Sequence, residues 1–255
     1  KLFVIGGGSG GVRAARYAAF NGIKTGIAEG WSLGGTCVNR GCIPKKLYTY
    51  ASNFSEEMQL MESFGWKSDN KTFSWKKLVT NKKKEIRRLN NIYSNLLINS
   101  NVTIFSDYAE FVNDETLKVG NDLIQAKSYL IAVGTKPKNL CLCKQKKLMS
   151  SDEAFDLKNL PKNILILGGG YIAIEFASIF KGLGVDTTVC IRGNRILRDF
   201  DVEVSDFLTN ELRDKGIKII NNDFPKEIIF SKNAYKVYFK KNTKTFQKVL
   251  EATGR

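Results

Sequence analysis

A glycine-rich turn that follows an apolar strand occurs twice in this chain, and this repeat limits the fold more than any other feature. The first turn, Gly6-x-Gly8-x-x-Gly11, follows Lys1-Leu-Phe-Val-Ile5, and the second, Gly168-x-Gly170-x-x-Ala173, follows Asn163-Ile-Leu-Ile-Leu167. In such a turn the first glycine permits a tight bend and the second lets a pyrophosphate approach the backbone. The third lets the following helix pack on the strand, and alanine is tolerated there. The repeat predicts a duplicated dinucleotide-binding fold rather than a short solenoid period.

The order of elements after each turn predicts an α/β protein with two Rossmann-like halves. Each half is expected to continue with a β-meander and to end in a strand that runs into a glycine, Gly134 in one half and Gly254 in the other. We therefore expect domains at 1–137 and 161–255, joined by a connector at 138–160. The predicted helices are 12–21, 44–54, 75–97, 151–157, 171–182 and 202–215.

The charge of the chain indicates the class of ligand. The 255 residues include 40 Lys and Arg against 25 Asp and Glu, a net charge of +15. The basic residues are scattered, and short clusters such as Lys82–Lys84 are not interleaved with aromatic residues, so we expect a solvated surface and small anionic ligands rather than nucleic acid. No apolar run reaches the about 18 residues of a transmembrane helix. We expect no membrane association and no export signal, hence a cytoplasmic protein, with an organelle left open.

The residue at the end of the second strand of each half predicts which dinucleotide binds there. Glu29 is placed to hold the ribose hydroxyls of an unphosphorylated adenosine in the first half. The corresponding position in the second half carries Arg192, and Arg198 follows, which favours a 2′-phosphate and thus NADP(H). The alternative is that both are ordinary surface arginines. Two dinucleotide folds suggest a reducing nicotinamide and a flavin that relays its electrons.

Two cysteines, Cys37 and Cys42, are separated by four residues just before the predicted helix that starts near Pro44. We expect these four residues, including Gly41, to form a small loop that brings the sulfurs together. A structural zinc site would need two more ligands, and the chain contains no histidine. A helix N-terminus with Lys45 and Lys46 nearby favours the thiolate, so a redox-active pair is the favoured interpretation. No such setting surrounds the other cysteines, and Cys190 is predicted to lie in the core.

These motifs together resemble the pyridine nucleotide–disulfide oxidoreductases. The resemblance is carried by Gly6–Gly11, by Gly34-Gly-Thr-Cys-Val-Asn-Arg-Gly-Cys42 and by Gly168–Glu175, and within the family it is strongest to the branch that reduces glutathione disulfide. It implies an FAD-binding domain at 1–137 with a redox disulfide, an NADPH-binding domain at 161–255, and a homodimer. In this family electrons pass from NADPH to FAD, then to the disulfide formed here by Cys37 and Cys42, and then to oxidised glutathione.

The resemblance implies roles for individual residues. Cys37 would attack the substrate, Cys42 would lie beside the flavin, Lys45 and Glu175 would form an ion pair near it, and Tyr171 would cover it; Lys46 is the alternative lysine, and a packing role is the alternative for Tyr171. The expected FAD contacts are Gly6, Gly8, Ser9, Gly10, Gly11, Glu29, Gly35, Thr36, Ala109 and Gly134. The expected NADPH contacts are Gly168, Gly170, Tyr171, Ile172, Ala173, Glu175, Arg192, Arg198 and Gly254. The expected substrate contacts are Ser9, Arg16 and Tyr93, with a core position as the alternative for Tyr93.

Several alternatives remain at this stage. A sibling reductase for trypanothione, lipoamide, mercuric ion or thioredoxin is the main one, and a basic nucleic-acid-binding protein with an inactive flavin fold is a remote one. The family's acid–base histidine lies in the partner subunit's C-terminal interface domain, whereas this chain has no histidine and ends at Arg255. The later central and interface domains are absent, so we expect part of a longer protein, with little reductase activity on its own.

Overall fold

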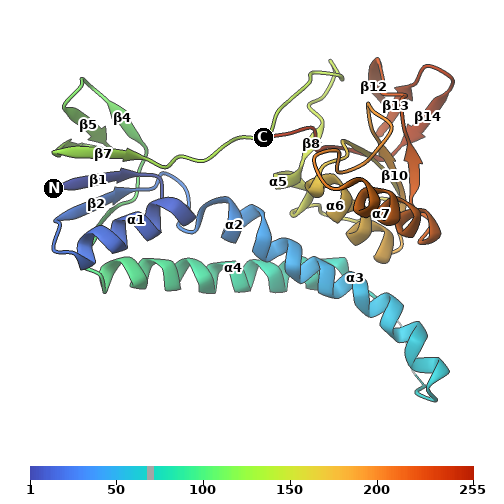
Figure 1. Ribbon diagram of the computed structural model, residues 1–255, viewed down its shortest axis with the longest axis horizontal. Coiled ribbons are helices and arrows are strands. Elements are labelled where there is room, and N and C mark those ends of the chain that lie inside the picture. Colours follow the sequence, from blue (N-terminus) through green and yellow to red (C-terminus); the bar gives the residue numbers. More distant parts are fainter. Residues whose placement is uncertain (68–71) are drawn as a thin grey trace. The chain divides into compact units, whose positions relative to one another are not determined.

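The computed structural model describes residues 1–67 and 72–255, which divide into two compact units (Figure 1). Unit 1 combines Lys1–Pro44 with Thr80–Thr135, and unit 2 combines Lys45–Val79 with Lys136–Arg255. Each unit contains one parallel sheet and one antiparallel sheet of three strands. The chain is therefore an α/β protein with two Rossmann-like halves, as the repeated glycine turn predicts.

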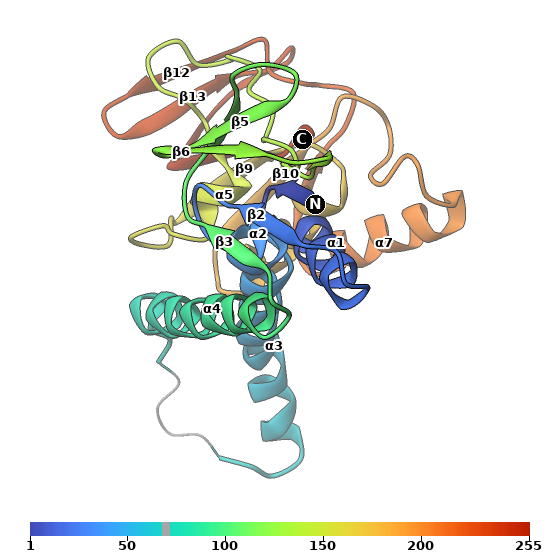
Figure 2. The same ribbon diagram turned by 90° about the vertical axis from the view of Figure 1, so that its left-hand side faces the viewer.

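Unit 1 is built on a parallel sheet with the strand order β3-β2-β1-β7. Its strands are β1 (Leu2–Ile5), β2 (Thr25–Ala28), β3 (Thr103–Phe105) and β7 (Ser128–Ile131). Helix α1 (Ser9–Phe20) joins β1 to β2 and buries Val12 and Ala15 against Val4 and Ile27 of the sheet. The antiparallel sheet, in which β5 lies between its neighbours (Figure 2), contains β4 (Ala109–Phe111), β5 (Thr116–Val119) and β6 (Asp122–Gln125).

Unit 2 is built on a five-stranded parallel sheet with the order β11-β10-β9-β15-β8. Its strands are β8 (Met149–Ser150), β9 (Asn163–Leu167), β10 (Asp186–Cys190), β11 (Lys218–Ile220) and β15 (Lys248–Glu251). The helices of this unit between β8 and β11 are α5 (Ser151–Ala154), α6 (Tyr171–Gly182) and α7 (Val202–Asp214). The antiparallel sheet contains β12 (Glu227–Ser231), β13 (Ala234–Tyr238) and β14 (Thr243–Phe246).

The order β11-β10-β9-β15 in unit 2 repeats the order β3-β2-β1-β7 in unit 1. In each unit the strand before the glycine turn is central: β1 lies between β2 and β7, and β9 lies between β10 and β15. Gly6 accordingly donates its N–H to the carbonyl of Ala28 on one side, and Gly168 donates to Cys190 in the same way. The predicted duplication is confirmed.

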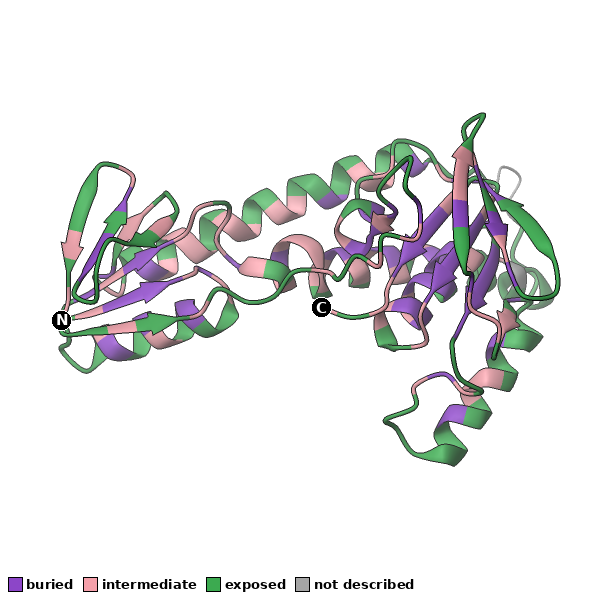
Figure 3. Cartoon of the chain, turned by 90° about the horizontal axis from the view of Figure 1, so that it is seen from above, coloured by how far each residue is buried: buried purple, intermediate pink, exposed green. Residues whose placement is uncertain are grey.

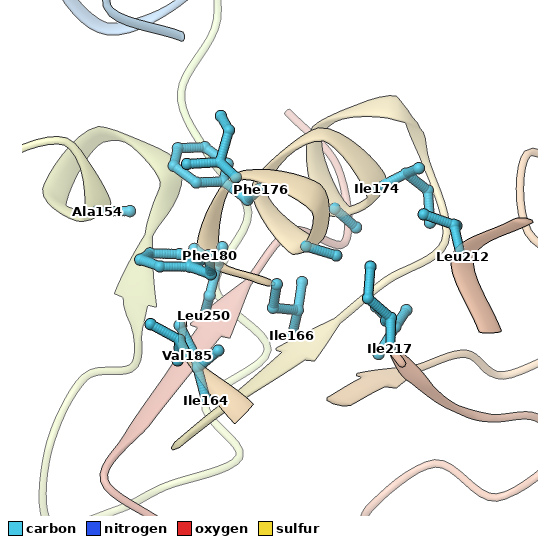
Figure 4. Close-up of a cluster of buried hydrophobic side chains, with 14 of the residues drawn as sticks. Ala154, Ile164, Ile166, Ile174, Phe176, Phe180, Val185, Leu212, Ile217 and Leu250 are labelled. Atoms are coloured by element: carbon cyan, nitrogen blue, oxygen red, sulfur yellow. The ribbon is translucent and has the colours of Figure 1, made fainter. Parts of the chain in front are cut away.

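The largest hydrophobic core lies in unit 2, where α6 packs on the parallel sheet. Phe176 and Phe180 of α6 belong to one cluster of buried side chains with Ile164 and Ile166 of β9 and Leu250 of β15 (Figure 4). The rings of Phe176 and Phe180 are stacked, with 5.9 Å between their centroids. The central strands carry fully buried aliphatic side chains, as expected for a parallel sheet that is covered by helices (Figure 3).

Three helices differ from the predicted ones at their ends, and one of them, α5, ends at Ala154 rather than at residue 157. Helix α1 begins at Ser9 rather than at residue 12, because the glycine turn itself forms its first turn. Helix α3 (Cys42–Ser63) begins two residues earlier than predicted and continues nine residues further than residue 54. Helix α4 (Trp75–Ile98) and strand β9 agree with the prediction to within one residue.

The segment 45–79 groups with unit 2, whereas the domain boundaries predicted from the sequence place it in the first domain. Tyr48 of α3 is buried, and its hydroxyl donates to the carbonyl oxygen of Phe155 at 2.7 Å. The Trp75 indole of α4 donates to the carbonyl of Leu157, also at 2.7 Å, and packs on Tyr48 with ring centroids 5.0 Å apart. These aromatic contacts attach the helical segment to unit 2. The assignment of functional domains stays a prediction.

Candidate active site

The first glycine turn, Gly6–Gly11, is shaped by close backbone contacts. Gly6 has a φ of 107°, and a Cβ there would collide with the carbonyl oxygen of Ala132. A Cβ at Gly11 would collide with the carbonyl oxygen of Gly6. At Gly10, in contrast, a Cβ would meet no described atom within 4 Å. The turn is therefore compact on its inner side and open at the start of α1.

The open side of this turn presents the first N–H groups of α1. Gly8 is the N-cap residue, and no side chain among the described residues caps the helix there. The first N–H groups of a helix have no partner within the helix and carry the positive end of its dipole. Ser9 and Gly10 thus lie in a position that suits a pyrophosphate.

Glu29, which follows β2, is held by two backbone N–H groups. Its Oε2 accepts from Gly7 at 2.8 Å and its Oε1 accepts from Trp31 at 2.9 Å. Each carboxylate oxygen has a further lone pair, so ribose hydroxyls could still donate to it. Tyr108, which the sequence analysis did not single out, lies against Gly30 next to this acid: a Cβ at Gly30 would be 2.6 Å from its ring. The absence of a side chain at Gly30 is the sequence signal for this contact.

The segment that carries the first cysteine forms a helix rather than the expected loop. Helix α2 (Gly35–Arg40) starts after Gly34, whose φ of 96° favours glycine. Asn39 holds this helix by donating to the carbonyls of Leu33 and Gly35 at 3.1 and 2.9 Å. The Asn39 amide thus pairs with backbone carbonyl groups around the start of α2 that would otherwise remain unpaired. This pairing favours a helix over the expected loop.

The two cysteines lie on either side of Gly41. Cys37 is half-buried in α2, and Cys42 is exposed as the first residue of α3. A Cβ at Gly41 would be 2.9 Å from the carbonyl oxygen of Thr36 and 3.3 Å from the Cα of Cys37. The backbone between the helices therefore passes close to Cys37, with no space for a side chain at residue 41. The pairing of the two sulfurs stays a prediction.

The first glycine turn and the start of α2 are in contact. Gly34 donates its N–H to the carbonyl oxygen of Gly7 at 2.8 Å. A Cβ at Gly35 would be 2.6 Å from the Cα of Gly8, so this approach requires glycine at residue 35, whereas a Cβ at Gly8 would make only an ordinary contact at 3.6 Å. Thr36 follows as an exposed residue. The structure thus brings together three elements predicted to bind one cofactor: the glycine turn, Glu29 and the start of α2.

The other residues predicted for unit 1 are placed as follows. Ala109 is the half-buried first residue of β4, and Gly134 has a φ of 68° after β7. Arg16 is exposed on α1, and its Nε lies 3.4 Å from the Ser100 Oγ. Tyr93 of α4 is partly buried against the core cluster of α1 and the sheet. Packing thus accounts for much of the Tyr93 side chain, and its substrate role stays a prediction.

The second glycine turn, Gly168–Ala173, repeats the geometry of the first. Gly168 has a φ of 128°, and a Cβ there would collide with the carbonyl oxygen of Ala252. Gly170 is the N-cap of α6, and a Cβ there would meet no described atom within 4 Å. Ala173 is fully buried, as the third position of the pattern requires. Tyr171 begins α6 with 59% of its surface exposed.

The remaining residues predicted near this turn are less exposed than Tyr171 or lie on the neighbouring strand end. Ile172 and Glu175 are half-buried on α6. Gly254 follows β15 with a φ of 135°, and its carbonyl accepts from the N–H of Lys138 at 2.9 Å. A positive φ at this site favours glycine because other residues are strained there.

Three arginines lie in the loop after β10. Arg192 is exposed and its guanidinium lies 4.7 Å from the centroid of the Phe224 ring. Arg198 is exposed, with its Nε 3.5 Å from Asp199. Arg195 was not predicted; its Nε is buried without a hydrogen-bond partner among the described residues. The sequence shows that Arg195 lies three residues from both Arg192 and Arg198. It does not show that the Nε of Arg195 is buried.

This loop is tied to the second glycine turn. The N–H of Leu197 donates to the carbonyl oxygen of Gly169 at 2.7 Å, and the Ser205 hydroxyl donates to Ile196 at 2.6 Å. The arginines therefore lie on a segment whose backbone is anchored to the turn that would hold a pyrophosphate.

Lys45 and Glu175 form an ion pair in unit 2, with 2.7 Å between Nζ and Oε1. Lys45 lies in the first turn of α3, and Glu175 lies in the second turn of α6. Lys46, the alternative lysine, is exposed, and its Nζ lies 5.6 Å from the centroid of the Tyr50 ring. The structure thus selects Lys45 as the partner of Glu175. Their function beside a cofactor stays a prediction.

The whole chain, residues 1–255, matches the family model described as pyridine nucleotide-disulphide oxidoreductase. The chain belongs to this family. It is 44% identical to the glutathione reductase of Burkholderia cepacia over 218 residues, which cover 86% of this chain and 49% of that protein. It is 38% identical to the chloroplastic/mitochondrial glutathione reductase of Pisum sativum over 268 residues, which cover 100% of this chain and 48% of that protein. The chain spans about half the length of these curated relatives.

A solved structure supports the same family. The HOCl-induced flavoprotein disulfide reductase RclA from Escherichia coli, determined as a Cu(II) complex, superposes with a TM-score of 0.87 at 26% identity. The match covers 100% of this chain and 56% of that one. None of the helices among the described residues is both long and apolar enough to span a membrane.

Family membership implies two cofactors, FAD and NADPH. The described residues fit both groups. The space above Gly10 and Gly170 is open at the first turn of each helix, where a pyrophosphate would lie. Glu29 offers carboxylate lone pairs to a ribose in unit 1, while exposed guanidinium groups take the corresponding place in unit 2.

Proposed function

We propose that this protein is an NADPH-dependent reductase of glutathione disulfide. The observation that carries the proposal is the arrangement of Cys37 within α2 and Cys42 at the start of α3, two helices joined by Gly41, which packs against Cys37. Two thiols separated by a tightly packed glycine can form a small disulfide ring and reopen it. The glutathione reductases that match the chain at 38 to 44% identity support the same reaction class.

The thiol chemistry uses this chain's own residues. The Cys37 thiolate attacks one sulfur of glutathione disulfide, forms a mixed disulfide with one glutathione, and releases the other as a thiolate that takes up a proton. The Cys42 thiolate then attacks the Cys37 sulfur, which forms the Cys37–Cys42 disulfide and releases the second glutathione. The protein loses two electrons and the substrate gains them. Bound FAD and NADPH supply the two electrons that return the cysteines to the dithiol.

The arginines of unit 2 support the preference for NADPH over NADH. Arg192 is held over Phe224 and Arg198 lies in the same anchored loop, both with exposed guanidinium groups. Guanidinium groups pair with phosphate oxygens through charge-assisted hydrogen bonds. An acid at this position would repel a 2′-phosphate.

The charge of the chain supports an anionic disulfide as substrate. Arg16 is exposed on α1, and the chain carries a net charge of +15. A positive surface raises the local concentration of an anion such as glutathione disulfide. It opposes trypanothione disulfide, which is cationic. The lipoamide branch uses NAD, which Arg192 and Arg198 disfavour.

The assembly and location belong to the same proposal. We infer a homodimer in which the partner subunit's C-terminal domain supplies the acid–base histidine, as the resemblance to the family implies. The cytoplasm is the proposed location; the name of the pea relative places that protein in chloroplasts and mitochondria.

The decisive experiment uses the full-length protein loaded with FAD. Oxidation of NADPH is followed with glutathione disulfide, lipoamide and trypanothione disulfide as separate substrates, and each assay is repeated with NADH. The proposal predicts fast turnover for NADPH with glutathione disulfide and slow turnover for every other combination. Turnover with NADH and lipoamide would retain the family but refute both the substrate and the cofactor preference.

A further inference from the structure

Unit 2 contains a cavity that none of the predicted site residues lines. Its volume is about 420 Å³, within the range of roughly 300 to 1,000 Å³ that is usual for small-molecule sites. It is an open pocket lined by the segment before β8, by Met149 of β8, by residues 153–159, and by one residue each from β13 and β15. Met149 and Leu157 form apolar parts of its wall.

Four lysines give the cavity its chemical character. They are Lys146, Lys147, Lys158 and Lys248. Lys158 and Lys248 make no ion pair with any described residue, and the Lys146 ammonium lies 4.5 Å from the centroid of the Phe230 ring. Lys146, Lys147 and Lys158 are exposed and Lys248 is half-buried, so together they give the cavity a positive potential that attracts an anion.

Tyr235 of β13 supplies a second and independent observation. The residue is 97% buried, lines the cavity, and makes no hydrogen bond with any described residue. In the described chain the buried side-chain atoms that lack a partner do not include this hydroxyl, so it reaches solvent at the cavity, where it can donate to a ligand. Burial raises the pKa of Tyr235, with a smaller contribution from the nearby Cys143 and Glu153, so the hydroxyl stays protonated and able to donate.

Two carboxylates also line the cavity. Glu153 accepts a hydrogen bond from the N–H of Ser150 at 2.6 Å, and its other oxygen lies 3.9 Å from the Lys147 Nζ. Asp156 is the other acid. Four ammonium groups against two carboxylates leave the lining with a net charge of +2.

Part of the cavity lies at the end of the parallel sheet opposite to the second glycine turn. Lys248 is the first residue of β15, and Asn159 precedes β9, so both are at the amino ends of these strands. Gly168 and Gly254 follow the carboxyl ends of the same strands, roughly 16 Å away for a five-residue strand. Met149 pairs with Leu250 of β15 and therefore lies nearer to the carboxyl ends.

We propose that this cavity is a binding site for a small organic polyanion, one that carries at least two phosphate or carboxylate groups. Lys158 and Lys248 bind its charges, and the Tyr235 hydroxyl donates a hydrogen bond to it. The apolar wall at Met149 and Leu157 accommodates its carbon skeleton. The site is independent of the reductase reaction proposed above.

The test is a calorimetric titration of the full-length, FAD-loaded protein with tripolyphosphate, and in a second arm with citrate. NADP⁺ is kept at saturation so that the arginines of the dinucleotide site are occupied. The variant Lys158→Gln/Lys248→Gln should weaken the binding of at least one of the two anions by at least about tenfold, because charge-assisted hydrogen bonds are lost. The control Lys226→Gln/Lys244→Gln removes two exposed lysines that do not line the cavity and should leave binding unchanged.

Tyr235→Phe separates ligand binding from folding. Because the hydroxyl has no partner in the described chain, its removal should leave the melting temperature unchanged or slightly higher while weakening the anion by roughly twofold to tenfold. Absence of binding of either anion to the wild-type protein would overturn the proposal. Equal weakening in the cavity variant and the control would overturn it too, because it would indicate a diffuse effect of the basic surface.

Discussion

Lys45 of α3 and Glu175 of α6 form an ion pair with 2.7 Å between Nζ and Oε1, although 130 positions separate them in the sequence. Their side chains are 29% and 38% exposed. A pair with this much solvent contact contributes about 0 to 1 kcal/mol to stability, because water screens it. Its importance therefore lies in fixing the first turn of α3 against α6.

We expect Lys45→Met to reduce turnover with glutathione disulfide about tenfold or more while lowering the free energy of unfolding by about 1 kcal/mol at most. A double-mutant cycle with Glu175→Gln, measured by urea denaturation, should give a coupling of roughly 0.5 kcal/mol. Lys46→Met is the matched control, since Lys46 is exposed and adjacent. Equal loss of turnover in Lys45→Met and Lys46→Met would refute the special role of the pair.

Arg192→Ala combined with Arg198→Ala should raise the KM for NADPH about tenfold to a hundredfold, because charged hydrogen bonds to a 2′-phosphate are lost. The KM for NADH should change little, since NADH lacks that phosphate. Steady-state kinetics with both nucleotides provides the measurement. Arg213→Ala, an exposed arginine in the last turn of α7, is the control and should leave both values unchanged. Undiminished use of NADPH by the double variant would contradict this assignment.

Cys42→Ser should trap the protein after the first thiol step. Once reduced and exposed to glutathione disulfide, this variant should gain one glutathionyl group at Cys37, because no second thiol is available to release it. Peptide mass spectrometry locates the modification. Cys37→Ser should lose turnover and should gain no stable glutathionyl group at Cys42. A stable adduct at residue 42 in Cys37→Ser, with none at residue 37 in Cys42→Ser, would reverse the assigned roles.

Two adjacent glycines of α1 should respond in opposite ways to the same substitution. Gly11→Ala places a Cβ against the carbonyl oxygen of Gly6 and should destabilise the protein by about 1 to 3 kcal/mol, the usual cost of overpacking. Gly10→Ala meets open space and should leave stability unchanged or raise it by up to about 1 kcal/mol, since alanine favours a helix. Urea denaturation compares the two. Equal destabilisation would show that the inner contact of the turn is not the cause.

Stability should fall at alkaline pH because of buried acidic groups in unit 2. Burial, with a smaller contribution from Asp223, raises the pKa of Cys190 from 9.0 to about 12, and burial with a contribution from Asp156 raises that of Tyr48. Above pH 9.0 the unfolded thiol has lost its proton while the folded one retains it. The free energy of unfolding then falls by up to about 1.4 kcal/mol per pH unit for this group, until pH approaches the folded pKa.

Urea midpoints across this alkaline range provide the measurement. Cys190→Ala should lower stability near neutral pH, because it leaves a cavity, yet reduce the alkaline fall. An alkaline fall of the same size in this variant would assign the effect to other groups.

The sequence by itself determined the duplicated fold and the positions of the two glycine turns. Gly6, Gly168 and Gly254 have positive φ values, a backbone conformation that favours glycine, so these glycines are a local signal in the sequence. Runs such as residues 163–167 predicted their strand because an apolar run between turn residues is a local signal. Helix α4 is long and amphipathic, and its bounds followed from the same kind of signal.

Tertiary structure decided what depends on residues far apart in the chain. Helix α2 replaces the expected loop because Asn39 is held in turn by Asn90 of α4, whose Nδ2 lies 3.0 Å from the Asn39 Oδ1. Lys45 rather than Lys46 meets Glu175 because only one of two adjacent side chains on α3 can face α6. The burial of Tyr48 against Phe155 and the unpaired hydroxyl of Tyr235 have no local signal at all. Packing free energy is summed over contacts that the folded chain creates, so it cannot be obtained from neighbours in the sequence.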